Sequence, residues 1–115
     1  MTLEEHNKAV VKQWVEIINE RNVDLVDDVL AENFISHQSG RSRDDHKREL
    51  AEGWFKQHPT LTLTIDAMIA EGDTVALRGT WHEDGQEPLL YLGFVRLVDR
   101  KVADHWHLSE PAKDA

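Results

Sequence analysis

The residues best suited to chemistry lie near the end of the sequence, in the stretch YLGFVRLVDRKVADHWHLSE (91–110). Its alternation of residue types predicts two antiparallel strands joined by a two-residue turn at Asp99-Arg100. In that register Val95 pairs with Asp104. Because side chains alternate across a strand, one face of the hairpin would carry Tyr91, Asp104, Trp106 and Glu110.

Carboxylates are costly on a mostly apolar face, so we interpret this face as the wall of a ligand cavity. A carboxylate half-buried against Trp106 would have a raised pKa, near the neutral value that a general acid/base needs. Glu110 is the first candidate for this role and Asp104 the second. The alternatives are a solvent-exposed Glu110 and a buried Asp104 that is simply satisfied by a hydroxyl, a backbone amide or the nearby Arg96. Tyr91 could donate a hydrogen bond to a developing enolate oxygen, or its hydroxyl could merely reach solvent.

Four tryptophans could hold the apolar body of a ligand in such a cavity. Trp14 and Trp54 lie at apolar positions of predicted helices, and Trp81 and Trp106 lie on predicted strands. At these spacings tryptophan is also an ordinary core residue. Their rings would suit a ligand with an apolar or aromatic body.

The composition restricts the partners. The 115 residues suit one domain, which we place at 1–115. The 22 acidic and 13 basic residues give a formal net charge of −9, which argues against nucleic acid and anionic membranes as partners. The lack of cysteine excludes disulfides and thiolate chemistry, and no nucleotide-binding fingerprint is present, so no cofactor is expected. The N-terminus is not typical of a signal peptide and no apolar run could span a bilayer, so we expect a cytoplasmic protein.

Three helices are predicted in the first half of the chain. Thr2 and Glu5 form a capping box, which predicts a helix over 3–22. A shorter helix is predicted within 23–34. A second capping box begins a helix over 43–57. The residues expected on the apolar side of this third helix are His46, Leu50 and Trp54.

The pattern then changes to the twofold period of strands. LTLTIDAMIA (61–70) and TVALRGTWH (74–82) predict a hairpin around a three-residue loop, with Ile69 opposite Val75. With the last hairpin this gives a four-stranded antiparallel sheet. The order predicts an α+β fold, a cone in which three N-terminal helices pack on the concave face of a curved sheet and leave a ligand pocket at its open end.

Three segments resemble the SnoaL-like branch of the nuclear transport factor 2 superfamily, which also holds ketosteroid isomerases, scytalone dehydratase and limonene epoxide hydrolase. They are AENFISH (31–37), AEGDTVALRGTWH (70–82) and RLVDRKVADHWHLSE (96–110), and the resemblance covers nearly the whole chain. It implies the cone fold, and it implies a homodimer formed through the outer face of the sheet.

The resemblance also implies roles for particular residues. In SnoaL-like polyketide cyclases the last strand commonly carries a hydrophobic residue, an acid and a tryptophan at alternate positions, and another acid four residues later. The residues that match this pattern are Val102, Asp104, Trp106 and Glu110. By resemblance, Glu110 would be the general acid/base, and His37, which closes NFISH, would line the same pocket. The loop HEDGQEP (82–88) departs from the family by being shorter.

Our first hypothesis is cofactor-independent acid/base chemistry on an apolar carbonyl compound: aldol cyclisation, isomerisation or dehydration through an enolate. The second is a non-catalytic ligand-binding or dimerisation module of the same fold. Water attack on an epoxide would need an Asp-Arg-Asp arrangement, but Asp66, Arg78 and Asp104 do not all share a predicted face.

Three histidines offer a metal-binding alternative. His82, His105 and His107 are predicted to point to the outer face of the sheet, and the last two have a spacing compatible with a shared metal ion. No acid is clearly placed to complete such a site, so we expect no metal. We expect this face, with Leu92 and Phe94, to pack against a second subunit.

Overall fold

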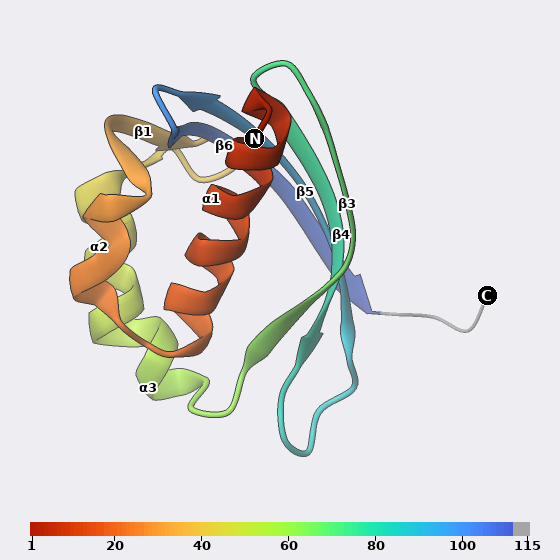
Figure 1. Ribbon diagram of the computed structural model, residues 1–115. Helices are drawn as coiled ribbons and strands as arrows, with labels where there is room; N and C mark the ends of the chain where they lie inside the picture. The colour runs from red at the N-terminus through yellow and green to blue at the C-terminus, as the bar shows by residue number, and fades with distance from the viewer. Residues whose placement is uncertain (112–115) are drawn as a thin grey trace.

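The computed structural model describes residues 1–111, which form a curved six-stranded sheet with helices against one face (Figure 1). The strand order is β2-β1-β6-β5-β4-β3, and only β1 and β6 pair in parallel. The helical elements are α1 (Leu3–Asn19), a 3₁₀ helix (Val23–Asp28), α2 (Arg43–Glu49), a π-helical turn (Leu50–Trp54) and α3 (Phe55–Gln57). The strands are β1 (Leu30–Ser36), β2 (Arg41–Ser42), β3 (Thr62–Glu71), β4 (Thr74–His82), β5 (Leu89–Val98) and β6 (Lys101–Pro111). The predicted α+β class is confirmed.

Helix α1 lies across the inner face of the sheet and contacts β3, β4 and β6. It begins as predicted, because the Thr2 hydroxyl accepts a hydrogen bond from the backbone N–H of Glu5. It ends at Asn19, before the predicted boundary at 22, because Arg21 adopts a left-handed conformation with φ 58°. The Arg21 side chain then donates to two carbonyl oxygens in the loop before β3, which ties the end of α1 to the sheet.

The second predicted helix, over 23–34, is wrong for most of its length. Only 23–28 is helical, as a 3₁₀ helix, and Leu30–Ser36 forms β1. This strand joins the edge of β6 and carries β2 on its other side. Leu30 and Phe34 are buried four residues apart, a spacing that suits a helix as well as a strand. The sheet therefore has six strands and not the predicted four.

The third predicted helix forms over 43–57, but its middle is not α-helical. Ser42 and Asp45 make the predicted capping box. Leu50–Trp54 is π-helical, and such turns are rare and often lie at functional sites. The π turn shifts the angular position of the residues that follow. Within it, Trp54 reaches the sheet and contacts Trp81 of β4, with ring centroids 5.7 Å apart.

Both hairpin turns contain two residues. Asp99 and Arg100 have φ values of 49° and 66°, as the predicted turn requires. The turn between β3 and β4 is one residue shorter than predicted, because Glu71 already pairs with Thr74. The register then shifts at a bulge between residues 65 and 67.

The shorter turn moves the distal half of β3 out of its predicted register. Ile69 pairs with Ala76 and not with Val75. Its side chain is 72% exposed, because it points to the outer face instead of the core. The exposed end of β3 adds to the apolar outer surface of the sheet.

A β-bulge in β6 overturns the predicted facing of the last strand. Asp104 pairs with Arg96 and not with Val95, so Ala103 is an extra residue. Val102 and Ala103 are both buried, at 0% and 2% exposed, which strict alternation would forbid. From Asp104 onward, the two faces of β6 are therefore exchanged relative to the prediction.

The continuous run of α2, the π-helical turn and α3 (43–57) is the second helical segment, and the core lies between α1, this segment and the inner face of the sheet. Among residues 1–111, the polar side chains in the buried class belong to Asn7, Ser36 and His105. No helix in the described part of the chain combines the length and apolar character needed to cross a membrane.

Candidate active site

Tyr91 and His105 form a hydrogen-bonded pair on the inner face of the sheet. Tyr91 Oη and His105 Nε2 are 2.7 Å apart, and the two residues are only 6% and 7% exposed. They come from the neighbouring strands β5 and β6. His105 points inward because the bulge at Ala103 turns its position toward the core. A buried hydroxyl and imidazole at this distance can pass a proton between them.

Gly93 makes room for this pair. The Tyr91 ring leans along β5 and covers Gly93, two residues away on the same face. A Cβ atom at position 93 would lie 2.8 Å from two carbons of the Tyr91 ring. Only glycine leaves the ring this close to the sheet.

His105 is the centre of a group of aromatic rings that come from both layers. His107 of β6 stacks on it with a centroid distance of 4.6 Å, and Trp14 of α1 meets it edge-on at 4.8 Å. His46 of α2 contacts Trp14 at 5.9 Å. The rings that continue the group along the sheet are Tyr91, Trp81 and Trp54. Three of the four tryptophans predicted to bind a ligand thus belong to one continuous aromatic group.

Three nitrogen atoms of this group are buried without a hydrogen-bond partner within residues 1–111. They are Trp14 Nε1, His46 Nε2 and His107 Nδ1, from α1, α2 and β6. Leaving such an atom unpaired costs about 1–3 kcal/mol. Buried polar groups are normally satisfied by protein, water or ligand atoms. These nitrogens could therefore form hydrogen bonds with a polar ligand bound between the helices and the sheet.

The titratable groups of the inner face are held in their uncharged forms. Burial lowers the pKa of His105 well below its usual value, and the nearby His107 and His46 add to the effect. Burial, assisted by Arg41, lowers the pKa of His46 to about 4. Burial also lowers the pKa of His107 and raises that of the Tyr91 hydroxyl. At neutral pH the imidazoles are thus free bases and the phenol keeps its proton.

Asp104 and His37 do meet, but on the outer face of the sheet. Asp104 accepts hydrogen bonds from His37 Nε2 at 2.7 Å and from Arg96 at 2.6 and 2.7 Å. Partial burial would raise the pKa of Asp104, but the bonds from His37 and Arg96 outweigh it and lower the pKa. The His37 ring stacks on Trp106, with centroids 4.4 Å apart. The alternative in which Asp104 is paired with Arg96 describes this contact.

The other two residues of the predicted face are also placed outside the cone. Trp106 is 40% exposed and pairs with Phe94. Glu110 is exposed near the end of β6, where it pairs with Leu90. Of the four residues predicted to share one face, only Tyr91 lines the inner side. The predicted convergence of the two acids on a pocket is therefore wrong, and the physical reason is the bulge at Ala103.

The facing predicted for the histidines is corrected in the same way. His105 and His107 point inward, whereas His82 is exposed at the end of β4. Within residues 1–111 no three His, Cys, Asp or Glu side chains are arranged to hold a metal ion. Asp66 and Arg78, considered for an epoxide reaction, are exposed, and Asp66 accepts a hydrogen bond from the Thr80 hydroxyl at 2.6 Å.

Trp54 separates the aromatic group from the protein surface. On one side it lines an open depression of about 500 Å³ beside the second helical segment, together with Arg41 and Gln57. On the other side it contacts Trp81 and His58. The inner rings pack against one another, so a ligand must move some of them to enter. Trp54 is the ring of this group that borders the depression.

The cone fold with a polar aromatic interior defines the class of this protein. Residues 11–105 match the SnoaL-like domain family, so the chain belongs to that family, within the nuclear transport factor 2 superfamily. No protein of curated function matches the sequence.

Solved structures agree with this assignment. IdmH from Streptomyces antibioticus, a candidate polyketide cyclase, has a TM-score of 0.78 at 17% identity over 90% of this chain and 91% of that chain. A candidate ketosteroid isomerase from Kribbella flavida has a TM-score of 0.81 at 22% identity over 100% and 85%. A SnoaL-like polyketide cyclase from Agrobacterium tumefaciens has a TM-score of 0.81 at 10% identity over 90% and 91%. At these identities the likeness establishes the fold and not the reaction.

The sequence contained signals for the residues that were missed. His46 was placed on the apolar side of a helix, where an imidazole needs a reason to be buried. Val102 and Ala103 are consecutive apolar residues in an otherwise alternating strand, which is the signature of a bulge. Reading that signal would have turned His105 and His107 inward.

Proposed function

We propose that the protein binds a small apolar or aromatic carbonyl compound between the helices and the sheet, and moves a proton on it without a cofactor. The observation that carries the proposal is the buried pair of Tyr91 and His105, 2.7 Å apart and surrounded by unpaired nitrogens. Such groups are costly in a core that has only a structural role. They are useful where charge develops during a reaction.

In the mechanism we propose, His107 is the base. Its Nδ1 is unpaired, and burial lowers its pKa, so its free-base form is present at neutral pH. It would take the proton on the carbon next to the substrate carbonyl, and the C–H electron pair would form the enolate. Tyr91 would donate its O–H to the enolate oxygen while accepting from His105 Nε2.

The protonated His107 would then return its proton. Delivery to a different carbon of the enolate completes an isomerisation. In an aldol cyclisation the enolate carbon attacks a second carbonyl, and the proton goes to the alkoxide oxygen that this attack forms. If a hydroxyl leaves from the β-carbon with that proton, the product is a dehydrated enone and water. Each route restores the neutral imidazole and consumes no cofactor.

Deuterium exchange tests this proposal without knowledge of the natural substrate. Flat aromatic ketones and small enones are incubated with the protein in D₂O, and loss of the α-proton signal is followed by NMR. We expect exchange above the buffer rate with the wild type and a loss of about 10²–10⁴-fold in Tyr91→Phe and His107→Gln. Glu110→Gln tests the competing assignment, since it should matter only if the exposed acid is catalytic. Exchange that depends on Glu110 and not on Tyr91 would sink the proposal.

A second candidate function, a dimerisation module, is supported by the outer face. Apolar side chains there are unusually exposed, including Leu92 at 47%, Phe94 at 52% and Leu108 at 69%. They lie beside a shallow apolar depression of about 420 Å³ over β3, β4 and β5. An exposed apolar surface of this kind favours association. We propose a homodimer through this face, which is compatible with catalysis on the inner side.

A further inference from the structure

We propose that the inner site takes only the uncharged form of a flat aromatic compound, and that Trp14 and His46 hold a second oxygen of this compound on the helix side. The proposal rests on the proposed function for the location of the ligand. It adds the ligand's charge, its shape and a second point of attachment opposite the Tyr91–His105 pair.

The second attachment point is defined by two unpaired nitrogens on contacting rings. Trp14 Nε1 and His46 Nε2 are both buried without a partner, and the two rings meet at 71° with centroids 5.9 Å apart. An indole N–H can only donate, and a neutral imidazole can donate from Nε2. One neutral oxygen, such as an ether or a carbonyl, could accept from both.

The shape of the ligand follows from the rings around this point. Phe34 meets Trp14 and His46 at 5.9 Å, and His105 lies against Trp14 at 4.8 Å. The walls are therefore made of aromatic faces and edges, which pack best on a flat aromatic body. His105 contacts both Tyr91 and Trp14, so a compound that reaches both must move rings that now touch, and it would carry an oxygen at each end.

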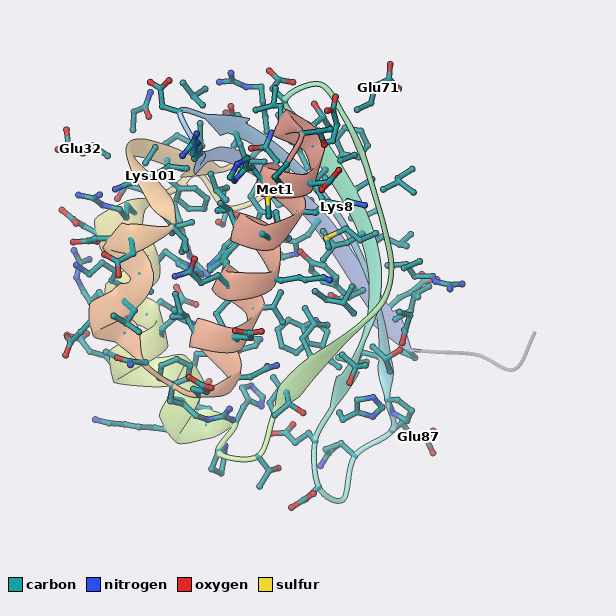
Figure 2. The ribbon with its side chains drawn as sticks, in the orientation of Figure 1. Met1, Lys8, Glu32, Glu71, Glu87 and Lys101 are labelled. Carbon is teal, nitrogen blue, oxygen red and sulfur yellow. The ribbon has the colours of Figure 1, made fainter. Side chains whose placement is uncertain are left out.

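The charge of the ligand follows from the lack of any counter-charge. Within residues 1–111 no Asp, Glu, Lys or Arg belongs to the buried class. Figure 2 shows the labelled Glu32, Glu71 and Glu87 at the periphery of the protein, and the Lys101 ammonium donates to the Asp27 carbonyl oxygen at 2.9 Å. Arg41 and Arg43, the two arginines on either side of the α2 N-cap, already have acidic partners: Arg41 pairs with Glu49 at 2.7 Å and Arg43 with Asp27 at 3.4 Å.

The titratable groups that face the site from its walls do not supply a charge either. His46, His105 and His107 are free bases at neutral pH, because burial lowers each pKa, and Tyr91 keeps its proton. A carboxylate bound here would lose its hydration and gain no opposite charge, which is strongly unfavourable. A neutral oxygen loses less hydration and gains the two unpaired donors.

Three probes on one ring system separate these effects: 2-acetylnaphthalene, its 6-methoxy derivative and its 6-carboxylate derivative. Their dissociation constants are measured on the whole protein at pH 7.5 by calorimetry. We expect the methoxy compound to bind about tenfold more tightly than the unsubstituted ketone, since it satisfies donors that otherwise stay unpaired. We expect the carboxylate to bind at least about a hundredfold more weakly than the methoxy compound.

Variants show whether the preference comes from the proposed atoms. Trp14→Phe should remove the gain from the methoxy group, so that the methoxy compound and the unsubstituted ketone bind this variant with equal affinity, whatever the affinity itself becomes. Trp106→Phe is the matched control on the outer face and should keep the full preference. Circular dichroism and thermal melting confirm that each variant is folded.

The outcomes also separate this inference from the proposed function. Equal binding of all three probes, or a methoxy preference that survives in Trp14→Phe, would overturn the inference and leave the Tyr91–His105 site standing. A resident water that satisfies both donors would give no methoxy preference and would count against it. A preference as expected, without deuterium exchange, would support the inference and contradict catalysis. Binding of none of the probes would contradict both.

Discussion

The Tyr91 hydroxyl lies where a side chain at position 93 would have to grow, since a Cβ on Gly93 would be 2.5 Å from Tyr91 Oη. This relationship fixes the height of the ring above the sheet. It also fixes the distance of the hydroxyl from His105 Nε2. The site therefore depends on a residue that has no side chain.

Gly93→Ala should break the Tyr91–His105 hydrogen bond. The added methyl group pushes the ring away, and we expect a loss of stability of about 1–3 kcal/mol in urea unfolding. The histidine ring signals in NMR should report a changed environment for His105. Gly53→Ala is the matched control, because nothing lies within 4 Å of a Cβ there.

A double mutant gives a stricter test of the same contact. In a Tyr91→Ala background the space above the sheet is empty, so Gly93→Ala should cost much less than it does alone. Equal costs in the two backgrounds would mean that the glycine matters for its backbone and not for the ring.

The stability of the protein should fall as the pH drops from about 6.5 to about 4. The folded pKa of His46 is about 4, whereas an unfolded histidine takes up its proton near 6.5. Between these values the unfolded state binds more protons, so acid favours unfolding. His105 and His107 act in the same direction, since burial lowers both pKa values. The lowered carboxylate pKa values act only below about pH 4.

The size of this effect can be measured by urea unfolding at pH 7 and at pH 4.5. Full protonation would withdraw a contribution on the order of 3 kcal/mol from His46 alone. His46→Gln should therefore have the flatter pH dependence. The same slope in the wild type and in this variant would show that His46 is not buried as a free base.

Asp104→Asn should affect stability and not the chemistry of the inner site. The substitution weakens the bonds from His37 and Arg96, and we expect a loss of about 1 kcal/mol above pH 5. Because the pKa of Asp104 is lowered, this contribution is present above the ordinary aspartate pKa and is lost as the pH falls through the folded value. Deuterium exchange should stay within about twofold of the wild type. Asp84→Asn, in an exposed loop, is the control for removing one negative charge.

Trp54→Ala should ease the entry of ligands. This ring stands between the surface depression and Trp81, so its removal leaves an opening in the wall. We expect association of the methoxy probe to become faster, by stopped-flow fluorescence. Stability should fall by about 2–4 kcal/mol, since the residue is a partly buried aromatic. An unchanged association rate in a folded variant would point to a different entrance.

Phe94→Glu should separate the proposed homodimer. The residue is central in β5 and half exposed on the outer face, so a charge there would be trapped in the interface. Light scattering after gel filtration should give the dimer mass for the wild type and the monomer mass for the variant. A wild type that is monomeric at high concentration would contradict the proposed partner.

The sequence was informative where the signal is local. The helix start at Thr2, the capping box at Ser42 and the turn at Asp99-Arg100 depend on neighbouring residues, and the structure confirms each of them. At Thr2 the structure gives the bond from the Glu5 backbone, which is half of the predicted capping box. β1 was missed because it pairs with β6, which is about seventy residues away in the sequence. The residues LAENFIS do not themselves indicate that they pair with this strand.

The prediction of the candidate site failed because of a single residue, Ala103. Strict alternation from Val102 grouped the right residues together on each face. The extra residue Ala103 places each of those groups on the face opposite to the predicted one. The predicted acid–tryptophan–histidine group of Asp104, Trp106 and His37 does assemble, on the opposite side of the sheet. Residue types predicted the cluster, whereas the register set by the bulge decides on which side of the sheet the cluster lies.

After the bulge, the two faces of β6 carry side chains with different surroundings. His105 and His107 face the interior, whereas Asp104, Trp106 and Leu108 face outward. Substitutions can therefore accumulate on the outward set, to suit a changing neighbour, while the inward set keeps its chemistry. One strand can in this way be selected for its outer contacts and for its inner chemistry independently.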